Sequence, residues 1–275
     1  MILRIHKPAF PLNRFIEHLV YYDGLSAAHN LDRFLPDGNT EIIIDLTEKP
    51  QYIYDNETLQ EIQACRHAWI SGVRTGPITI PSGNGSRMLI VAFKKGKAFP
   101  FYRFPMNELT DTVAEAELVF GRSVVNLREQ LLAAKSVGRI FQLVEEFLLY
   151  QAGDAIEEST STRCVGHALL SIITNPTIRC LHQLNDEMGY SRKHFIDLFK
   201  AQVGASPKQY LKIMRFQKAV CAIETSELIQ WSAIALDSGY YDQAHFINDF
   251  KLFSGFTPNE YLKKKSSLLN YVPVD

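Results

Sequence analysis

The amino-acid sequence predicts an α+β fold in two parts: a small N-terminal β-sheet or barrel-like domain with helices, and a C-terminal all-α domain that carries a tandem helix-turn-helix. Three observations support this prediction. Short runs of branched apolar residues bounded by Gly, Pro, Ser or Asn fill the first 105 residues, as is typical of strands. Apolar residues at helical spacing follow as far as residue 150. An internal repeat occupies the last hundred residues.

The elements of the N-terminal part follow from these patterns. A turn signal, Pro36-Asp37-Gly38-Asn39, precedes the first predicted strand. We expect strands at Thr40–Leu46, Ala68–Val73, Pro77–Pro81 and Met88–Phe93, and then helices at Asn107–Val119, Val124–Ala134 and Arg139–Tyr150. Several strands at such short spacing indicate a small sheet, a sandwich or a barrel.

The C-terminal repeat becomes visible when the chain is shifted by 51 residues. At least nine positions then carry the same residue, which is far more than chance provides: His194/His245, Phe195/Phe246, Ile196/Ile247, Phe199/Phe250, Lys200/Lys251, Gly204/Gly255, Pro207/Pro258, Tyr210/Tyr261 and Leu211/Leu262. Each copy has a short helix that ends at a glycine, then a capping residue and a second helix, which is the helix-turn-helix pattern. The first helices are Leu181–Met188 before Gly189 and Ser232–Ser238 before Gly239, and the caps are Ser191 and Asp242.

The second helix of each copy turns an aromatic face inward and a more polar face outward. The outward residues are of types that read base edges in a major groove. Arg or Lys binds guanine, Gln or Asn binds adenine, Asp accepts from cytosine, and Ile or Ala touches a thymine methyl group. We therefore predict DNA-binding roles for Arg192, Lys193, Ile196, Asp197 and Lys200 in the first copy, and for Gln243, Ala244, Ile247, Asn248 and Lys251 in the second.

Other residues near these faces are candidates for contacts with the DNA backbone. A connecting helix is predicted over Pro207–Glu224, and its length of about 25 Å, together with two turns, can hold two recognition helices in successive major grooves about 34 Å apart. We predict phosphate contacts by His194, His245, Lys208 and Lys212. Packing or capping is the alternative role for the two histidines.

Composition and charge agree with a division of the chain. Residues 151–163 (QAGDAIEESTSTR) are small, polar and acidic, so we expect a sensor or dimerisation domain at 1–150, a linker at 151–163, a double helix-turn-helix DNA-binding domain at 164–265 and a tail at 266–275. The net charge of the whole chain is −1. Residues 1–162 carry 16 basic and 20 acidic residues, whereas residues 163–265 carry 13 and 9. The second part is thus mildly basic, as suits a module that binds phosphates.

The doubled module resembles the AraC/XylS transcription regulators over about residues 164–265. The resemblance rests on the segment SRKHFIDLF at Ser191–Phe199 followed by Gly204 and Pro207, and on Arg215 and Ala219 in the connecting helix. Its strongest part is the stretch Ile234-Ala235, Gly239-Tyr240, Phe246, Phe250-Lys251, Gly255, Thr257-Pro258 and Tyr261. Two positions depart from the family pattern, since Asp197 stands where a basic or amide residue is common and Asn248 where arginine is common. Both departures remove positive charge, which lowers the expected attraction to the DNA backbone or changes the base that is read.

Three pieces of the N-terminal part are similar to a domain that precedes this module in some family members. They are Leu35–Gly38 followed by an apolar strand, the segment Trp69–Thr75 (WISGVRT), and Glu108–Asp111 (ELTD). In the family such domains sense small molecules or mediate self-association. The resemblance therefore implies a small-molecule effector or a homodimer. For Trp69, Arg74 and Tyr102, a structural role and a place in a ligand pocket both remain open.

The alternative reading is an enzyme, either a metal-dependent cupin-like enzyme or a DNA-repair enzyme fused to a DNA-binding module. The histidines of the first part lack the H-x-H spacing of a cupin metal site, and the chain contains no G-x-S-x-G, H-E-x-x-H or phosphate-loop motif. The four cysteines are scattered, without the close spacing of metal clusters. We therefore expect no catalytic residues, no metal and no cofactor.

Function and location follow from these expectations. The sequence predicts a sequence-specific transcription regulator whose partners are double-stranded DNA and RNA polymerase, and it leaves open whether the protein is an activator or a repressor. The N-terminus lacks the apolar core of a signal peptide, and no apolar run reaches the ~20 residues of a membrane helix. We therefore expect a cytoplasmic protein with no membrane contact.

Overall fold

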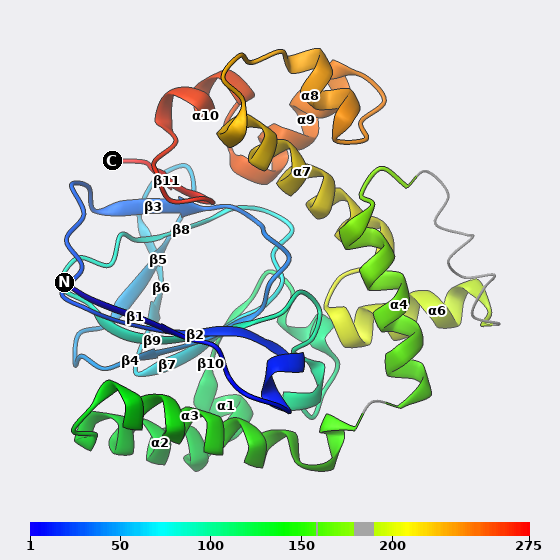
Figure 1. The fold of residues 1–275 in the computed structure, drawn as a ribbon. Coiled ribbons are helices and arrows are strands. Elements are labelled where there is room, and N and C mark those ends of the chain that lie inside the picture. Colours follow the sequence, from blue (N-terminus) through cyan, green and yellow to red (C-terminus); the bar gives the residue numbers. More distant parts are fainter. Residues whose placement is uncertain (158, 179–189) are drawn as a thin grey trace.

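The structure, a computed structural model, describes residues 1–157, 159–178 and 190–275. Two antiparallel sheets and three helices form an N-terminal β domain (residues 1–156), and a helical region (residues 160–264) lies along one side of it (Figure 1). The predicted α+β fold is confirmed. In the described part of the chain, no helix is both long enough and apolar enough to span a membrane.

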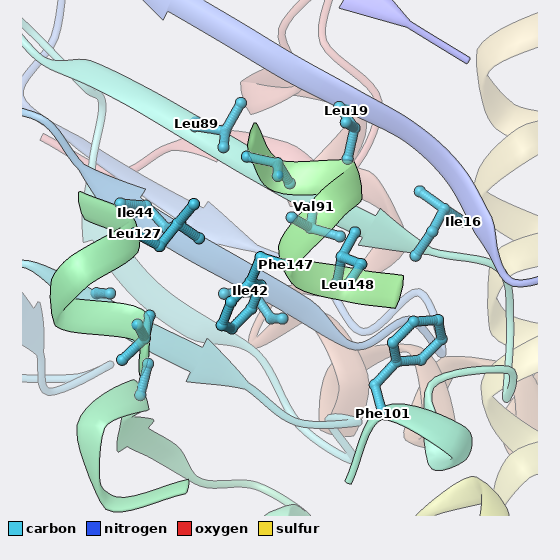
Figure 2. Close-up of a cluster of buried hydrophobic side chains, with 14 of the residues drawn as sticks. Ile16, Leu19, Ile42, Ile44, Leu89, Val91, Phe101, Leu127, Phe147 and Leu148 are labelled. Carbon is cyan, nitrogen blue, oxygen red and sulfur yellow. The ribbon is translucent and has the colours of Figure 1, made fainter. Parts of the chain in front are cut away.

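The larger sheet lies on the helices of the β domain. Its strand order is β1 (Ile2–His6), β2 (Ile16–Asp23), β9 (Arg87–Phe93), β4 (Glu41–Asp45), β7 (Ala68–Ser71) and β10 (Val113–Glu115). Because side chains alternate along a strand, one face carries Ile42 and Ile44 of β4 beside Leu89 and Val91 of β9. This face packs against helices α1 (Ala116–Phe120), α2 (Arg122–Ala133) and α3 (Val137–Ala152), as Figure 2 shows for Leu127, Phe147 and Leu148. Burial of each such side chain contributes about 1.5–3 kcal/mol.

The smaller sheet includes a strand from the far end of the chain. Its order is β11 (Tyr271–Pro273), β3 (Leu31–Phe34), β8 (Ile78–Pro81), β5 (Gln51–Tyr54) and β6 (Glu61–Cys65). Strand β11 pairs antiparallel with β3, with Val272 opposite Arg33 and almost fully buried. The segment 266–275, predicted to be a tail, therefore supplies an edge strand to the N-terminal β domain (Figure 1).

The helical region is built from α4 (Thr160–Thr174), α6 (Arg192–Val203), α7 (Pro207–Thr225), α8 (Trp231–Asp237), α9 (Gln243–Ser254) and α10 (Pro258–Lys264). One hydrophobic cluster joins these helices, and it includes Leu35 and Val73 from the β domain. Short 3-10 turns lie at Leu12–Arg14, Phe99–Phe101, Met106–Leu109 and Gly153–Ile156.

Most predicted elements in the described residues are confirmed, and the exceptions are the linker and the helix predicted at Asn107–Val119. The predicted strands correspond to β4, β7, β8 and β9, and the predicted helices at 124–134, 139–150 and 207–224 correspond to α2, α3 and α7. The predicted linker 151–163 is instead largely occupied by the end of α3, a 3-10 turn and the start of α4. The first helix of the first repeat, predicted at Leu181–Met188, lies outside the described residues.

The helix predicted at Asn107–Val119 is wrong. Here a 3-10 turn is followed by β10, and only α1 at the end is helical. Leu109, Val113 and Ala116 are all buried, at a spacing that also fits a helix. They lie in three different elements, with Leu109 and Ala116 in the core under the larger sheet and Val113 in a separate small cluster, and β10 extends the larger sheet by pairing with β7. Apolar spacing alone therefore could not distinguish this arrangement from a helix.

Candidate nucleic-acid interface

Both candidate recognition helices begin and end in the same way. The side chain of Ser191 accepts a hydrogen bond from the backbone N–H of His194 at 3.3 Å, and Asp242 accepts from that of His245 at 2.7 Å. Each bond satisfies an amide that has no partner inside the helix. Helix α6 ends at Gly204 (φ 99°) and α9 at Gly255 (φ 76°), in the left-handed conformation that favours glycine.

The chain also leaves the two helices in the same way. After each glycine, a capping box and a proline start the next helix: Ser206 with Gln209 before α7, and Thr257 with Glu260 before α10. The repeat predicted from the sequence therefore appears in the structure as the same set of capping hydrogen bonds around both candidate recognition helices. Because the caps fix where each helix begins, they also fix which residues of its first turns face outward.

An aromatic core sets the rotation of each helix about its axis. Phe199 of α6 and Phe250 of α9 are fully buried, and each packs edge-on against a tyrosine at the same place in the repeat, Tyr210 and Tyr261. The opposite faces of the helices are therefore directed away from the core. Seven of the ten predicted DNA-binding residues are exposed, namely Arg192, Lys193, Asp197, Gln243, Ala244, Asn248 and Lys251. Ile196 and Lys200 are half-buried, and Ile247 is half-buried and packs against the hydrophobic cluster of the helical region.

The predicted phosphate contacts have unequal surroundings. Lys208 is exposed at the start of α7. The rings of His194 and His245 pack edge-on against Tyr190 and Tyr240, with centroids 5.0 and 5.3 Å apart. Both histidines also donate their backbone N–H to the cap, so they have the packing and capping contacts that the sequence left as their alternative role.

Lys212 has a protein partner that the sequence analysis missed. Its ammonium lies 3.1 Å from the carboxylate of Asp249, which is 7% exposed on the inner side of α9. The imidazole of His245 lies 3.5 Å from the other oxygen of the same carboxylate. Asp249 therefore links the connecting helix to the second recognition helix. Its signal in the sequence was an acidic residue four positions after His245 on an otherwise apolar face.

The three N-terminal segments noted for their family resemblance all contact the helical region. Gly38 (φ 81°) accepts a 2.9 Å hydrogen bond from the buried hydroxyl of Tyr210, and the carbonyl of Pro36 accepts one from Gln217 at 2.7 Å. A Cβ atom at Gly38 would lie 2.7 Å from Met214, so this loop and α7 are in close contact. Burial, together with the nearby charge of Asp37, raises the pKa of Tyr210 well above its usual range.

The other two segments meet at the end of the first recognition helix. The hydroxyl of Thr110 donates to the carbonyl of Gly204, the residue that ends α6. A Cβ atom at Gly204 would lie 3.4 Å from Val73, and Val73 accepts a backbone hydrogen bond from Asp111 at 3.0 Å. Trp69–Thr75 and Glu108–Asp111 thus form one surface against α6.

The second copy contacts the smaller sheet. The guanidinium of Arg33 on β3 lies over the ring of Phe256, 4.9 Å from its centroid, and a Cβ atom at Gly255 would lie 2.7 Å from that guanidinium. Beyond α10, the carboxylate of Asp275 accepts hydrogen bonds from the backbone N–H groups of Asn30 and Leu31. The β domain therefore contacts the helical region at the end of each candidate recognition helix.

Comparison with known proteins identifies both parts. Residues 184–264 match a family model described as a helix-turn-helix domain, and residues 4–115 match one described as a domain of unknown function, DUF6597. An uncharacterized HTH-type transcriptional regulator of Haemophilus influenzae is 29% identical over 148 residues, which are 53% of this chain and 47% of that protein. The match spans about half the length of this curated relative. The chain thus carries a helix-turn-helix domain behind a DUF6597 domain.

Among solved structures, the chain is similar to ToxT from Vibrio cholerae. A 1.65 Å structure of ToxT aligns with a TM-score of 0.47 and 11% identity, over 89% of this chain and 98% of that one. A structure of ToxT with a bound unsaturated fatty acid aligns with a TM-score of 0.46 and 11% identity, over 91% and 96%.

Proposed function

We propose that this chain is a transcription regulator that binds duplex DNA sequence-specifically, with α6 and α9 in two consecutive segments of the major groove. The observation that carries the proposal is the repeated arrangement of cap, aromatic core and outward polar face in the two helices. The ten residues named above are the proposed reading residues. The types exposed at these positions, Arg, Lys, Gln, Asn and Asp, have hydrogen-bonding groups that match base edges.

The connecting helix supports simultaneous reading by one chain. Helix α7 has 19 residues, so it is about 28 Å long. With the turns at its two ends it suits the spacing of about 34 Å between successive major-groove segments. A single chain then reads two half-sites, which does not require a homodimer but permits one.

The β domain is proposed to regulate the reader. Support comes from its contacts with the residues that end α6 and α9, because a change in the β domain can reach both helices through them. We further propose that the β domain binds a small-molecule effector or mediates self-association. The whole regulator is proposed to act in the cytoplasm and to contact RNA polymerase.

Selection of bound sites from random duplex DNA by the full chain tests the proposal. We expect an enriched site with two half-sites about one helical turn apart, bound at least about 10³-fold more tightly than random duplex near 150 mM salt. A Lys193→Ala Gln243→Ala double variant should lose the enrichment, whereas Lys263→Ala, an exposed lysine in the last turn of α10, should keep it. Equal affinity for the selected and the random duplex would refute sequence-specific reading.

A further inference from the structure

A cavity of about 290 Å³ lies beside the smaller sheet, between β5, β6 and β8 and the turn that leads into β10. Its apolar wall is formed by Ile53, Ile78 and Val113, which belong to a small hydrophobic cluster separate from the two main cores. Its charged lining residues are Asp55, Arg74 and Asp111. A few charged groups beside an apolar wall are typical of small-molecule sites.

Arg74 is incompletely bonded within the described part of the chain. Its Nη1 donates to the backbone carbonyl of Asp111 at 3.0 Å, while its buried Nε has no hydrogen-bond partner there. The carboxylate of Asp111 accepts instead from the backbone N–H and the hydroxyl of Thr75, at 2.7 and 2.5 Å. Burial lowers the pKa of Arg74. An unsatisfied buried donor costs free energy, so this guanidinium is under-bonded in the free protein, and an external acceptor would bind it at the Nη groups because the Nε is closed to solvent.

Asp55 and Asp111 add negative charge to the lining of the cavity, beside the positive charge of Arg74. The side chain of Asp55 accepts hydrogen bonds from the backbone of Glu57 and Thr58 and from the hydroxyl of Thr58, and these bonds hold its pKa below the usual range. Asp55 is therefore ionised at neutral pH. A simple anion would meet two carboxylates in this cavity as well as the guanidinium. A small zwitterion can satisfy both signs of charge and place an apolar group on the apolar wall.

The lining of the cavity is also connected to both candidate recognition helices. Next to Asp111, Thr110 donates to Gly204 at the end of α6. On the other side, the backbone carbonyl of Asn56 accepts from Arg33, whose guanidinium lies against Gly255 and Phe256 at the end of α9. Asp111 itself has a left-handed backbone (φ 55°), an uncommon conformation that is often found at functional sites.

We propose that this cavity binds an apolar amino acid, or a zwitterion like it, with the carboxylate on Arg74 and the ammonium group on the Asp55 and Asp111 side, and that its occupancy changes DNA affinity. The second half of this inference rests on the proposed function. The site itself stands on the cavity, the incompletely bonded guanidinium and the two carboxylates.

Calorimetric titration of the full chain tests the site. The probes are L-leucine, L-isoleucine and L-phenylalanine at up to about 10 mM, with N-acetyl-L-leucine and L-leucinamide as matched compounds that lack one charged end. We expect at least one amino acid to bind, and removal of either charge to weaken binding about tenfold or more. Binding by none of the three amino acids, or equal binding of the matched compounds, would overturn the site.

Variants separate the site from general destabilisation. Arg74→Gln and Asp55→Asn should each weaken the amino acid about tenfold, while Arg66→Gln, a change at an exposed arginine nearby, should leave binding unchanged. Thermal unfolding without ligand checks that each variant is folded, and unchanged binding by both folded cavity variants would overturn the assignment.

DNA titration with the selected duplex tests the coupling. Addition of the bound amino acid should change the DNA affinity at least about threefold in the native chain and in Arg66→Gln, but not in Arg74→Gln. Calorimetric binding without any change in DNA affinity would refute the coupling and leave the site in place. Failure to select any duplex would refute the proposed function and leave the calorimetric result standing on its own.

Discussion

The two copies of the repeat share their internal design and differ in what surrounds them. Both helices have an oxygen cap, a buried phenylalanine pair and a left-handed glycine. The first copy contacts the β domain through hydrogen bonds to Gly204 and from Tyr210, whereas the second contacts it through Arg33 and the strand β11. The second copy also has an internal ion pair with the connecting helix, between Lys212 and Asp249. A duplicated fold can thus keep its local bonding while each copy acquires its own contacts.

The aromatic cores should show the largest effect. Phe199→Ala and Phe250→Ala each remove a fully buried ring and should cost about 3–5 kcal/mol in urea unfolding. Because Phe199 packs against Tyr210, its loss should also speed amide hydrogen exchange around Gly38, and the loss of Phe250 should not. Leu252→Ala, at an exposed position of α9, is the control and should change stability by less than about 0.5 kcal/mol. Equal exchange around Gly38 in both phenylalanine variants would remove the difference drawn between the copies.

The reading faces should show the next largest effect. Lys193→Ala in α6 and Gln243→Ala in α9 should each weaken binding to the selected site by about 1–3 kcal/mol, and only at one base step. Competition among single-base variants of the duplex measures this. A uniform loss across all duplexes would instead make the residue a phosphate contact.

The ion pair tests what is particular to the second copy. Lys212→Met leaves the buried Asp249 carboxylate without its ammonium partner and should lower stability by about 1–2 kcal/mol. Further change of Asp249 to Asn should restore part of this loss, and Lys208→Met, at an exposed lysine of the same helix, should change little. If stability is unchanged while DNA affinity falls, Lys212 acts as the predicted phosphate contact and not as a structural link.

The caps should show the smallest and most equal effects. Ser191→Ala and Asp242→Ala each remove one cap acceptor and should cost about 1 kcal/mol. Thermal unfolding of the two variants side by side measures the difference. A gap larger than about 1 kcal/mol between them would show that the caps, too, have diverged.

Much of the helical region could be predicted because its signals are local. A cap, its amide three residues on and the glycine at the helix end all lie within one segment, so Ser191, Gly204, Asp242 and Gly255 identify their helices directly. The same locality gave the outward direction of the reading residues. Their contacts with DNA remain a prediction, since exposure shows only that they are accessible.

Contacts between distant segments could not be predicted in this way. The buried Asp249 is held by Lys212, 37 positions earlier in the chain, and the residues 271–273 pair with a strand at 31–34. The helix expected at Asn107–Val119 failed for the same reason, because Leu109 and Ala116 are buried in the core of the larger sheet while Val113 is buried in a separate small cluster.

The sequence by itself determined the α+β fold, the repeat and the caps and ends of the two candidate recognition helices, because each of these helix signals depends on residues a few positions apart. Only the tertiary structure decided that the three N-terminal segments meet the helical region, that β11 joins the smaller sheet, and that Arg74 lines a cavity. These features depend on how sheets and helices pack, and chain segments far apart in sequence carry no local signal of which partner they will find.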